Sequence, residues 1–237
     1  MRLGTRGSEL ARTQSGTVAA ALEQLGFDVE LTIIKTAGDR EHDERVRVDR
    51  PARRVRRARS SKRSSSKRIE LAVHSFKDLP TKSPAELVIG AVPTRVDPAD
   101  LLLVRRDAVA RRGRRLAAAA SRRARRHGVG ARRALAQALS PDLVVEPLRG
   151  NVPTRVRTPR REGQFDAIVL AAAGVERLQA EQRLGSALDG VTVLRLDPQR
   201  FVPAPAQGAL AVQCRRDDAR VLAALARSTT RRAASRP

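Results

Sequence analysis

Short apolar runs alternate with amphipathic helical patterns along most of this chain. Residues 1–4 and 29–35 are predicted strands, and a helix predicted over 9–25 separates them and ends at Gly26. Strands that alternate with helices in this way predict an α/β fold in which crossover helices join the strands.

The same pattern continues to residue 226. It predicts further strands over 71–74, 87–92, 101–104, 143–145, 167–171, 191–194 and 209–212, and helices over 152–161, 172–178 and 217–226. Two proline-containing stretches, 92–98 and 196–205, restrict the backbone, and we expect the chain to change domain there. The predicted organisation is domain 1 over 1–93 and 196–226, domain 2 over 94–195, and a disordered tail over 227–237.

The net charge of +23 is unevenly distributed. Residues 50–68 hold ten basic and no acidic residues, and 105–133 and 227–237 are also strongly basic, so the rest of the chain is nearly neutral. None of the three segments contains an aromatic residue for stacking on bases, which argues against a nucleic-acid-binding protein. Residues 50–68 have no apolar period and are predicted to be disordered, and 105–130 to be irregular.

Cysteine and histidine are scarce. Cys214 is the single cysteine, and the three histidines share no ligand spacing, so we expect neither a disulfide nor a metal site. The first ten residues lack the apolar core of a signal peptide, and no run is long enough for a membrane span. The expected location is the cytoplasm.

The string LAVHSFKDLP, residues 71–80, runs from an apolar strand into a polar loop. It places Ser75, Lys77 and Asp78 at the carboxyl end of the strand, where open α/β sheets bind ligands. A carboxylate beside a lysine can stay ionised and stabilise a cationic intermediate or move a proton. Taken alone, the string equally suits a solvated turn pair, which is the commoner case.

Two further loops carry arginines. LRGNVPTR, residues 148–155, presents Arg149 and Arg155 around a helix start, and TRGS, residues 5–8, presents Arg6. Three such loops after strands suggest a substrate that bears several carboxylates. We expect Arg6, Ser75, Asp78, Arg149 and Arg155 to converge on one cleft between the domains.

Six strings together resemble the hydroxymethylbilane synthase (porphobilinogen deaminase) family in order and spacing: GTRGSELARTQ, KTAGDR, ELAVHSFKDLPT, LVVEPLRGNVPTR, FDAIVLAAAGVERL and PAPAQGALAVQCRRDD. The resemblance covers most of that family's first two domains. It implies two periplasmic-binding-protein-like α/β domains with mixed sheets, two hinge crossovers between them, and an absent third α+β domain.

The resemblance also implies an activity. The family links four porphobilinogen molecules head to tail with release of ammonia, on a covalently held dipyrromethane, in tetrapyrrole biosynthesis. Asp78 would be the catalytic carboxylate, and the protein would be a cytoplasmic monomer that binds neither membranes nor a specific nucleic acid. The implied substrate- and cofactor-binding residues are Arg6, Ser8, Gln14, Ser75, Lys77, Arg149, Gly150, Asn151, Arg155 and Arg177, with Arg132 and Arg133 at about the place of the family's paired arginines.

The chain departs from the family in two ways. The family's third domain carries the loop cysteine that holds the dipyrromethane, and Cys214 is not that residue but matches a cysteine in a domain 1 strand. Covalent attachment is then impossible, and this copy is expected to be inactive. The basic segments keep the family's spacing but not its residues, and we hypothesise that they are frameshifted.

Two alternatives stay open at this point. A nucleic-acid-binding protein would use the arginine tracts and bind less tightly as salt rises. A carboxylate-binding module of two domains would close over its ligand without chemistry, although Asp78 would then have no evident use.

Overall fold

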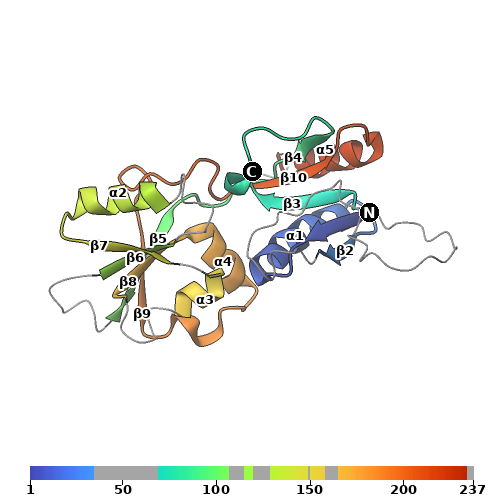
Figure 1. Ribbon diagram of the computed structural model, residues 1–237. Helices are drawn as coiled ribbons and strands as arrows, with labels where there is room; N and C mark the ends of the chain where they lie inside the picture. The colour runs from blue at the N-terminus through green and yellow to red at the C-terminus, as the bar shows by residue number, and fades with distance from the viewer. Residues whose placement is uncertain (35–68, 107–114, 120–128, 149, 158–164, 234–237) are drawn as a thin grey trace, which may run out of the picture. The chain divides into compact units, whose positions relative to one another are not determined.

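The computed structural model describes residues 1–34, 69–106, 115–119, 129–148, 150–157 and 165–233 (Figure 1). The chain divides into two compact units, Met1–Thr94 with Leu210–Pro237, and Arg95–Ala209. Each unit is built on its own five-stranded sheet.

The first unit has a mixed sheet in the order β2-β1-β3-β10-β4. Its elements are β1 (Arg2–Thr5), α1 (Glu9–Glu23), β2 (Glu30–Ile33), β3 (Leu71–Ser75), the 3-10 helix η2 (Phe76–Asp78), β4 (Leu87–Ala91), β10 (Leu210–Arg215) and α5 (Ala219–Ala233). β1 runs parallel to both β2 and β3, whereas β10 is antiparallel to β3 and β4. The carboxyl ends of β1, β2 and β3 therefore meet at one edge of the sheet.

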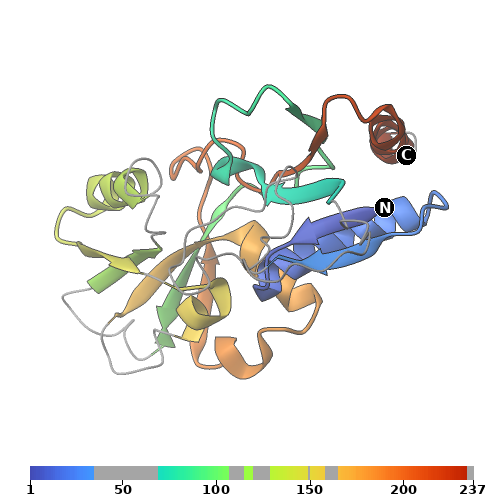
Figure 2. The same ribbon diagram turned by 45° about the vertical axis from the view of Figure 1, so that its right-hand side comes forward.

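Helices α1 and α5 share a core with this sheet. Leu22 of α1 and Leu225 of α5 are fully buried in one cluster with Leu3 and Leu71 of the strands. In Figure 2, α1 runs alongside the blue strands β1 and β2. Apolar residues at helical spacing thus bury one face of each helix, which is the principal stabilising term for such layers.

The second unit repeats the same arrangement, in the order β7-β6-β8-β5-β9. Its elements are β5 (Asp100–Arg105), β6 (Arg115–Ala119), α2 (Val129–Leu139), β7 (Val144–Leu148), α3 (Val152–Arg157), β8 (Ala167–Ala171), α4 (Ala172–Ala180), the 3-10 helix η5 (Gly185–Leu188) and β9 (Val191–Arg195). β6 is parallel to β7 and β8, and β5 is antiparallel to β8 and β9. α2 covers one face, and α3 and α4 the other (Figure 1).

The α/β class and the mixed sheets are confirmed, and the structure differs from the predicted organisation at three places. Strand β6 lies inside 105–130, where irregular structure was expected, and α5 continues to Ala233, into the predicted tail. Residues 196–209 belong to the second unit instead of the first, because Leu196 N donates to Asp100 O over 2.9 Å and Phe201 packs in the core with Ala136. The prediction for 50–68 lies outside the described residues.

The residues after Arg95 and those before Leu210 lie against each other in the second unit. Val96 N donates to Gly208 O over 3.3 Å, and Arg95 Nε donates to Gln207 O over 2.8 Å. Gly208 has a φ of +87°, and a Cβ there would lie 2.5 Å from Val96 O. The position therefore requires glycine both for its backbone conformation and for the close approach of the two segments.

Substituting Gly208 with alanine is expected to lower the free energy of unfolding by about 2–4 kcal/mol, from the left-handed conformation and the overlap with a backbone oxygen. Thermal denaturation followed by circular dichroism measures this. Gly130→Ala is the control, because that helical glycine has nothing within 4 Å of the added Cβ. Equal melting temperatures for the two variants would contradict the prediction.

Candidate functional site

Polar residues collect at the carboxyl edge of the first sheet. β1 and β3 are parallel neighbours in the register Leu3 with Leu71, so the loops that follow them leave from the same edge. Arg6 follows β1, and Lys77 and Asp78 follow β3; all three side chains are exposed. This edge thus presents two cationic groups and a carboxylate to solvent.

The loop that carries Arg6 is fixed at both ends. Thr5 is buried, and its Oγ1 donates to Ala11 O over 3.1 Å. Ser8 is the N-cap of α1, where its Oγ accepts a hydrogen bond from Ala11 N over 3.4 Å. Ser8 was predicted to assist binding, and the structure shows it capping the helix that follows Arg6.

Gln14 and Ser75 are brought together although they lie 61 positions apart in the sequence. The buried Gln14 lies on α1, and its Nε2 donates to Ser75 Oγ over 3.0 Å. This hydrogen bond ties α1 to the end of β3. It fixes the point from which the chain turns toward Lys77 and Asp78.

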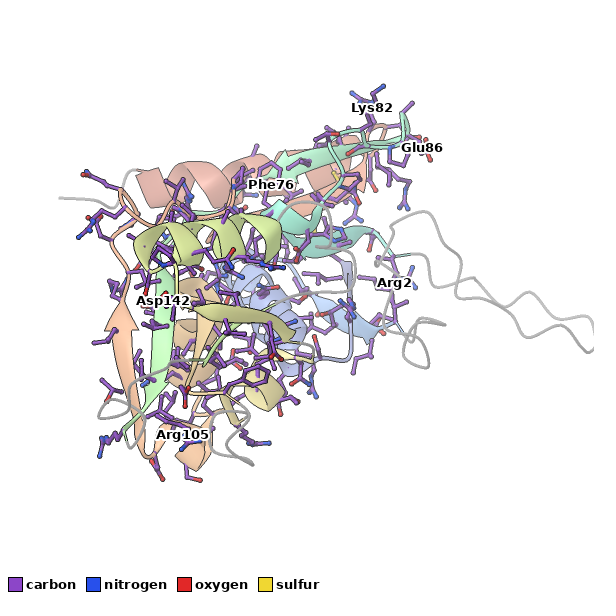
Figure 3. The ribbon with its side chains drawn as sticks, turned by 60° about the vertical axis from the view of Figure 1, so that its left-hand side comes forward. Arg2, Phe76, Lys82, Glu86, Arg105 and Asp142 are labelled. Carbon is purple, nitrogen blue, oxygen red and sulfur yellow. The ribbon has the colours of Figure 1, made fainter. Side chains whose placement is uncertain are left out.

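A single 3-10 turn then positions the lysine and the carboxylate. Phe76, labelled in Figure 3, opens the turn, and Leu79 N donates to Phe76 O over 3.1 Å to close it. The turn exposes Lys77 and Asp78 side by side in sequence at the sheet edge.

In the second unit, the loop after β7 is shaped by Gly150 and Asn151. Gly150 has a φ of +109°, and an added Cβ would lie 3.2 Å from Thr154 Cγ2. Asn151 Oδ1 accepts a hydrogen bond from Thr154 N over 2.9 Å, and Asn151 O accepts one from Arg155 N over 3.0 Å. The half-buried Arg155 is therefore held on a fixed turn, whereas Arg149 lies outside the described residues.

Two of the other predicted arginines contact protein groups of the second unit. Arg177 Nη2 donates to Gly208 O over 3.0 Å, and burial lowers the pKa of its guanidinium against the opposing effect of Glu176. Arg132 forms an ion pair with Asp100, with Nη2 lying 2.6 Å from Oδ1. Arg133, the next residue, is exposed.

The polar residues Asp100 and Gln207 were missed at the sequence level. Both are buried, and both contact Arg132. Their signal in the sequence is a polar residue set among apolar and proline residues in DPAD and PAPAQG, which indicates a buried hydrogen-bonded group but not its partner.

Cys214 lies in β10 and is fully buried. Burial raises the pKa of its thiol, with a contribution in the same direction from Asp218 and an opposing one from Arg215. A neutral, inaccessible thiol is a poor nucleophile.

The ranges that the structure describes contain neither a candidate metal site nor a membrane-spanning helix. No group of three or more His, Cys, Asp or Glu side chains there could hold a metal ion. No helix in the same ranges has the length and apolar character needed to cross a membrane.

Two solved structures resemble this fold. The VFT2 domain of BvgS from Bordetella pertussis matches with a TM-score of 0.50 and 13% identity, over 97% of this chain and 86% of that one. The second substrate-binding domain of a putative amino acid ABC transporter from Streptococcus pneumoniae matches with a TM-score of 0.52 and 9% identity, over 98% and 93%. At these identities the likeness shows the fold alone, and it confirms the predicted periplasmic-binding-protein-like architecture.

Sequence comparisons are more specific. The porphobilinogen deaminase of Nocardia farcinica is 40% identical over 228 residues, which cover 95% of this chain and 60% of that protein. Porphobilinogen deaminase 1 of Streptomyces avermitilis is 41% identical over 233 residues, which cover 95% and 68%. The chain thus spans about two thirds or less of the length of these relatives. Residues 1–223 match the family model described as porphobilinogen deaminase, dipyromethane cofactor binding domain, and the chain belongs to the porphobilinogen deaminase family.

Proposed function

We propose that this chain is the porphobilinogen- and dipyrromethane-binding part of a hydroxymethylbilane synthase, a transferase of tetrapyrrole biosynthesis. The observation that carries the proposal is the sheet edge of the first unit, where Arg6 and Asp78 follow two parallel neighbouring strands and are both exposed. This edge therefore offers a guanidinium that can bind a carboxylate and a carboxylate that can bind a cation.

Porphobilinogen has complementary chemistry. It carries an acetate and a propionate, a pyrrole N–H, and an aminomethyl group that is protonated near neutral pH. Arg6 would receive the carboxylates. Lys77, Ser8, Gln14 and Ser75 would assist it. In the second unit, Arg155 on its fixed turn, with Arg149, Gly150 and Asn151, would serve the same class of group.

Asp78 would act on the reacting group. When the protonated aminomethyl group leaves as ammonia, the positive charge passes to the pyrrole as an azafulvenium cation. A nearby carboxylate stabilises that cation, and it can accept the proton released when the next pyrrole carbon bonds to the methylene. Asp78 is the acidic residue of η2, the turn after β3, and it is exposed, so it can serve as this carboxylate.

The family's dipyrromethane fits the same donors, because it bears carboxylates and pyrrole N–H groups as the substrate does. Arg6 and Asp78 of the first unit are the residues that would hold it. When bound, it supplies the pyrrole carbon to which the first substrate is joined. We also propose a cytoplasmic monomer without specific affinity for nucleic acid, which sedimentation and salt-dependent binding assays would test.

Arg6→Ala and Arg155→Ala are each expected to weaken porphobilinogen binding about tenfold or more, because each removes a charge-assisted hydrogen bond to a carboxylate. Isothermal titration calorimetry of the purified chain measures this. Arg183→Ala is the control, since Arg183 is exposed and pairs with Glu181 on the surface. If the unaltered chain binds no porphobilinogen, or if all three variants bind alike, the proposed function fails.

A further inference from the structure

Three side chains of the second unit, Asp100, Arg132 and Gln207, form a polar cluster that we name the crossover clasp. Gln207 is completely buried. Its Nε2 donates to Pro98 O over 2.7 Å and to Asp100 Oδ1 over 2.8 Å, and its Oε1 accepts from Arg132 Nη2 over 3.2 Å. Both ends of the amide are therefore occupied by groups of the protein.

The ion pair at the centre of the clasp is largely buried. Asp100 is 1% exposed, and the Arg132 side chain is 13% exposed. Arg132 Nε lies 3.1 Å from Asp100 Oδ2, and Nη2 lies 2.6 Å from Oδ1, a two-pronged contact that uses both carboxylate oxygens. Burying either charge without the other is strongly unfavourable, so each residue requires its partner.

This pairing bears on the function of Arg132. Its positive charge is cancelled by a carboxylate at hydrogen-bond distance, and a ligand carboxylate placed beside it would also meet the negative charge of Asp100. Drawing the guanidinium toward a ligand would leave Asp100 buried without its counter-charge. The geometry therefore favours a fixed structural cation at this position.

Arg133 is placed differently. Consecutive residues of an α-helix point about 100° apart around its axis, so on α2 the two arginines leave the helix in different directions. Arg133 is exposed, and no ion pair of Arg133 is found among the described residues. Its charge is available to an anion from solution.

We propose that Arg132 has a structural role: held by Asp100 and Gln207, it joins the segments after Arg95 and before Leu210 to α2. Arg133 alone of this pair binds a ligand carboxylate. The assignment of Arg133 rests on the proposed function, whereas the role of Arg132 does not. Gln207 is the positioning residue of the clasp, because it contacts Pro98 O, Asp100 and Arg132 at once.

The test uses the 237-residue chain and four variants: Asp100→Asn, Arg132→Gln, the double variant with both changes, and Arg133→Ala. Melting temperature is measured by circular dichroism and porphobilinogen affinity by calorimetry. Asp100→Asn and Arg132→Gln should each lower the melting temperature by about 5 °C or more. The double variant should lose clearly less than the sum, because it leaves no buried charge, and it keeps the affinity of the unaltered chain within about twofold. Arg133→Ala should melt within about 1 °C of the unaltered chain and bind porphobilinogen about fivefold more weakly or worse.

Opposite results would overturn the proposal. If Arg132 were a ligand residue, Asp100→Asn would strengthen porphobilinogen binding by releasing the guanidinium, and the double variant would bind as weakly as Arg133→Ala or more weakly. Additive losses of melting temperature would show that Asp100 and Arg132 are not coupled. If the unaltered chain binds no porphobilinogen, the assignment of Arg133 falls with the proposed function, and the coupling of melting temperatures still decides the role of Arg132.

Discussion

Replacing Asp78 with asparagine is expected to lower the turnover of porphobilinogen by about 100-fold or more. The amide has the shape of the carboxylate but no charge, so it can neither stabilise the azafulvenium cation nor accept the proton released on bond formation. Asp78 ends an exposed 3-10 turn and lies in no core cluster, so folding should be unaffected. This prediction rests on the proposed function, and its assay requires an active enzyme that contains this chain and a covalently bound dipyrromethane.

Two further variants make this assay specific. Asp78→Glu keeps the charge but moves it by one methylene, and it should retain intermediate activity. Asp142→Asn, an exposed aspartate after α2, is the matched control and should turn over normally. An Asp78→Asn enzyme that works as well as the Asp142→Asn enzyme would remove Asp78 from the mechanism.

Strand β8 shows most clearly why some strands could be predicted from the sequence alone. β8 reads AIVLA, and four of its five residues are buried, so its apolar run admits few other structures. β10, which pairs with β3 and β4 inside the first sheet, is similar, with five of its six residues buried. Such strands are predictable because their residues have no favourable place outside a core.

Strand β6 was not predictable in this way. Its sequence, RLAAA, is rich in alanine, which is uncommon in strands, and it stands within a strongly basic stretch. Its backbone pairs with β7 on one side and β8 on the other. Those pairings, which join residues distant in sequence, specify the strand where local preference does not.

The candidate site was also predictable only in part. The loops after β1 and β3 could be found from the rule that ligands bind at carboxyl ends of strands, and the family resemblance named the residues. The resemblance did not show that Ser8 caps α1 or that Gln14 holds Ser75. The spacing also did not indicate that Arg132 pairs with Asp100, because that contact depends on where the segment after Arg95 lies.

A polypeptide of these 237 residues is expected to carry no covalently attached dipyrromethane. The sequence contains a single cysteine, Cys214, and its side chain is fully buried in β10. Its Sγ lies 3.0 Å from the position that a Cβ on Gly90 of the neighbouring strand β4 would occupy, so no space for a pyrrole exists on that side. Burial also raises the pKa of the thiol, which keeps it protonated and unreactive.

The raised pKa of this thiol predicts how stability depends on pH. The folded protein holds the thiol proton more tightly than the unfolded chain, so this contribution to stability is complete below the ordinary pKa of 9.0. It is lost as the pH rises from there through the pKa of the folded state. In Cys214→Ala, denaturant unfolding should lack this part of the alkaline decrease in stability.

Mass spectrometry and thiol titration test the absence of attachment directly. The intact chain, expressed in cells that synthesise porphobilinogen, should show the mass of its sequence, 25.8 kDa, with no added pyrrole units. A thiol reagent should modify Cys214 about 100-fold more slowly in the folded protein than in denaturant, because the thiol is buried and protonated. The denatured sample is the control for reagent and stoichiometry. A dipyrromethane adduct on Cys214, or equally fast labelling of the folded protein, would show that the thiol reaches the surface and that primer attachment within these residues is possible.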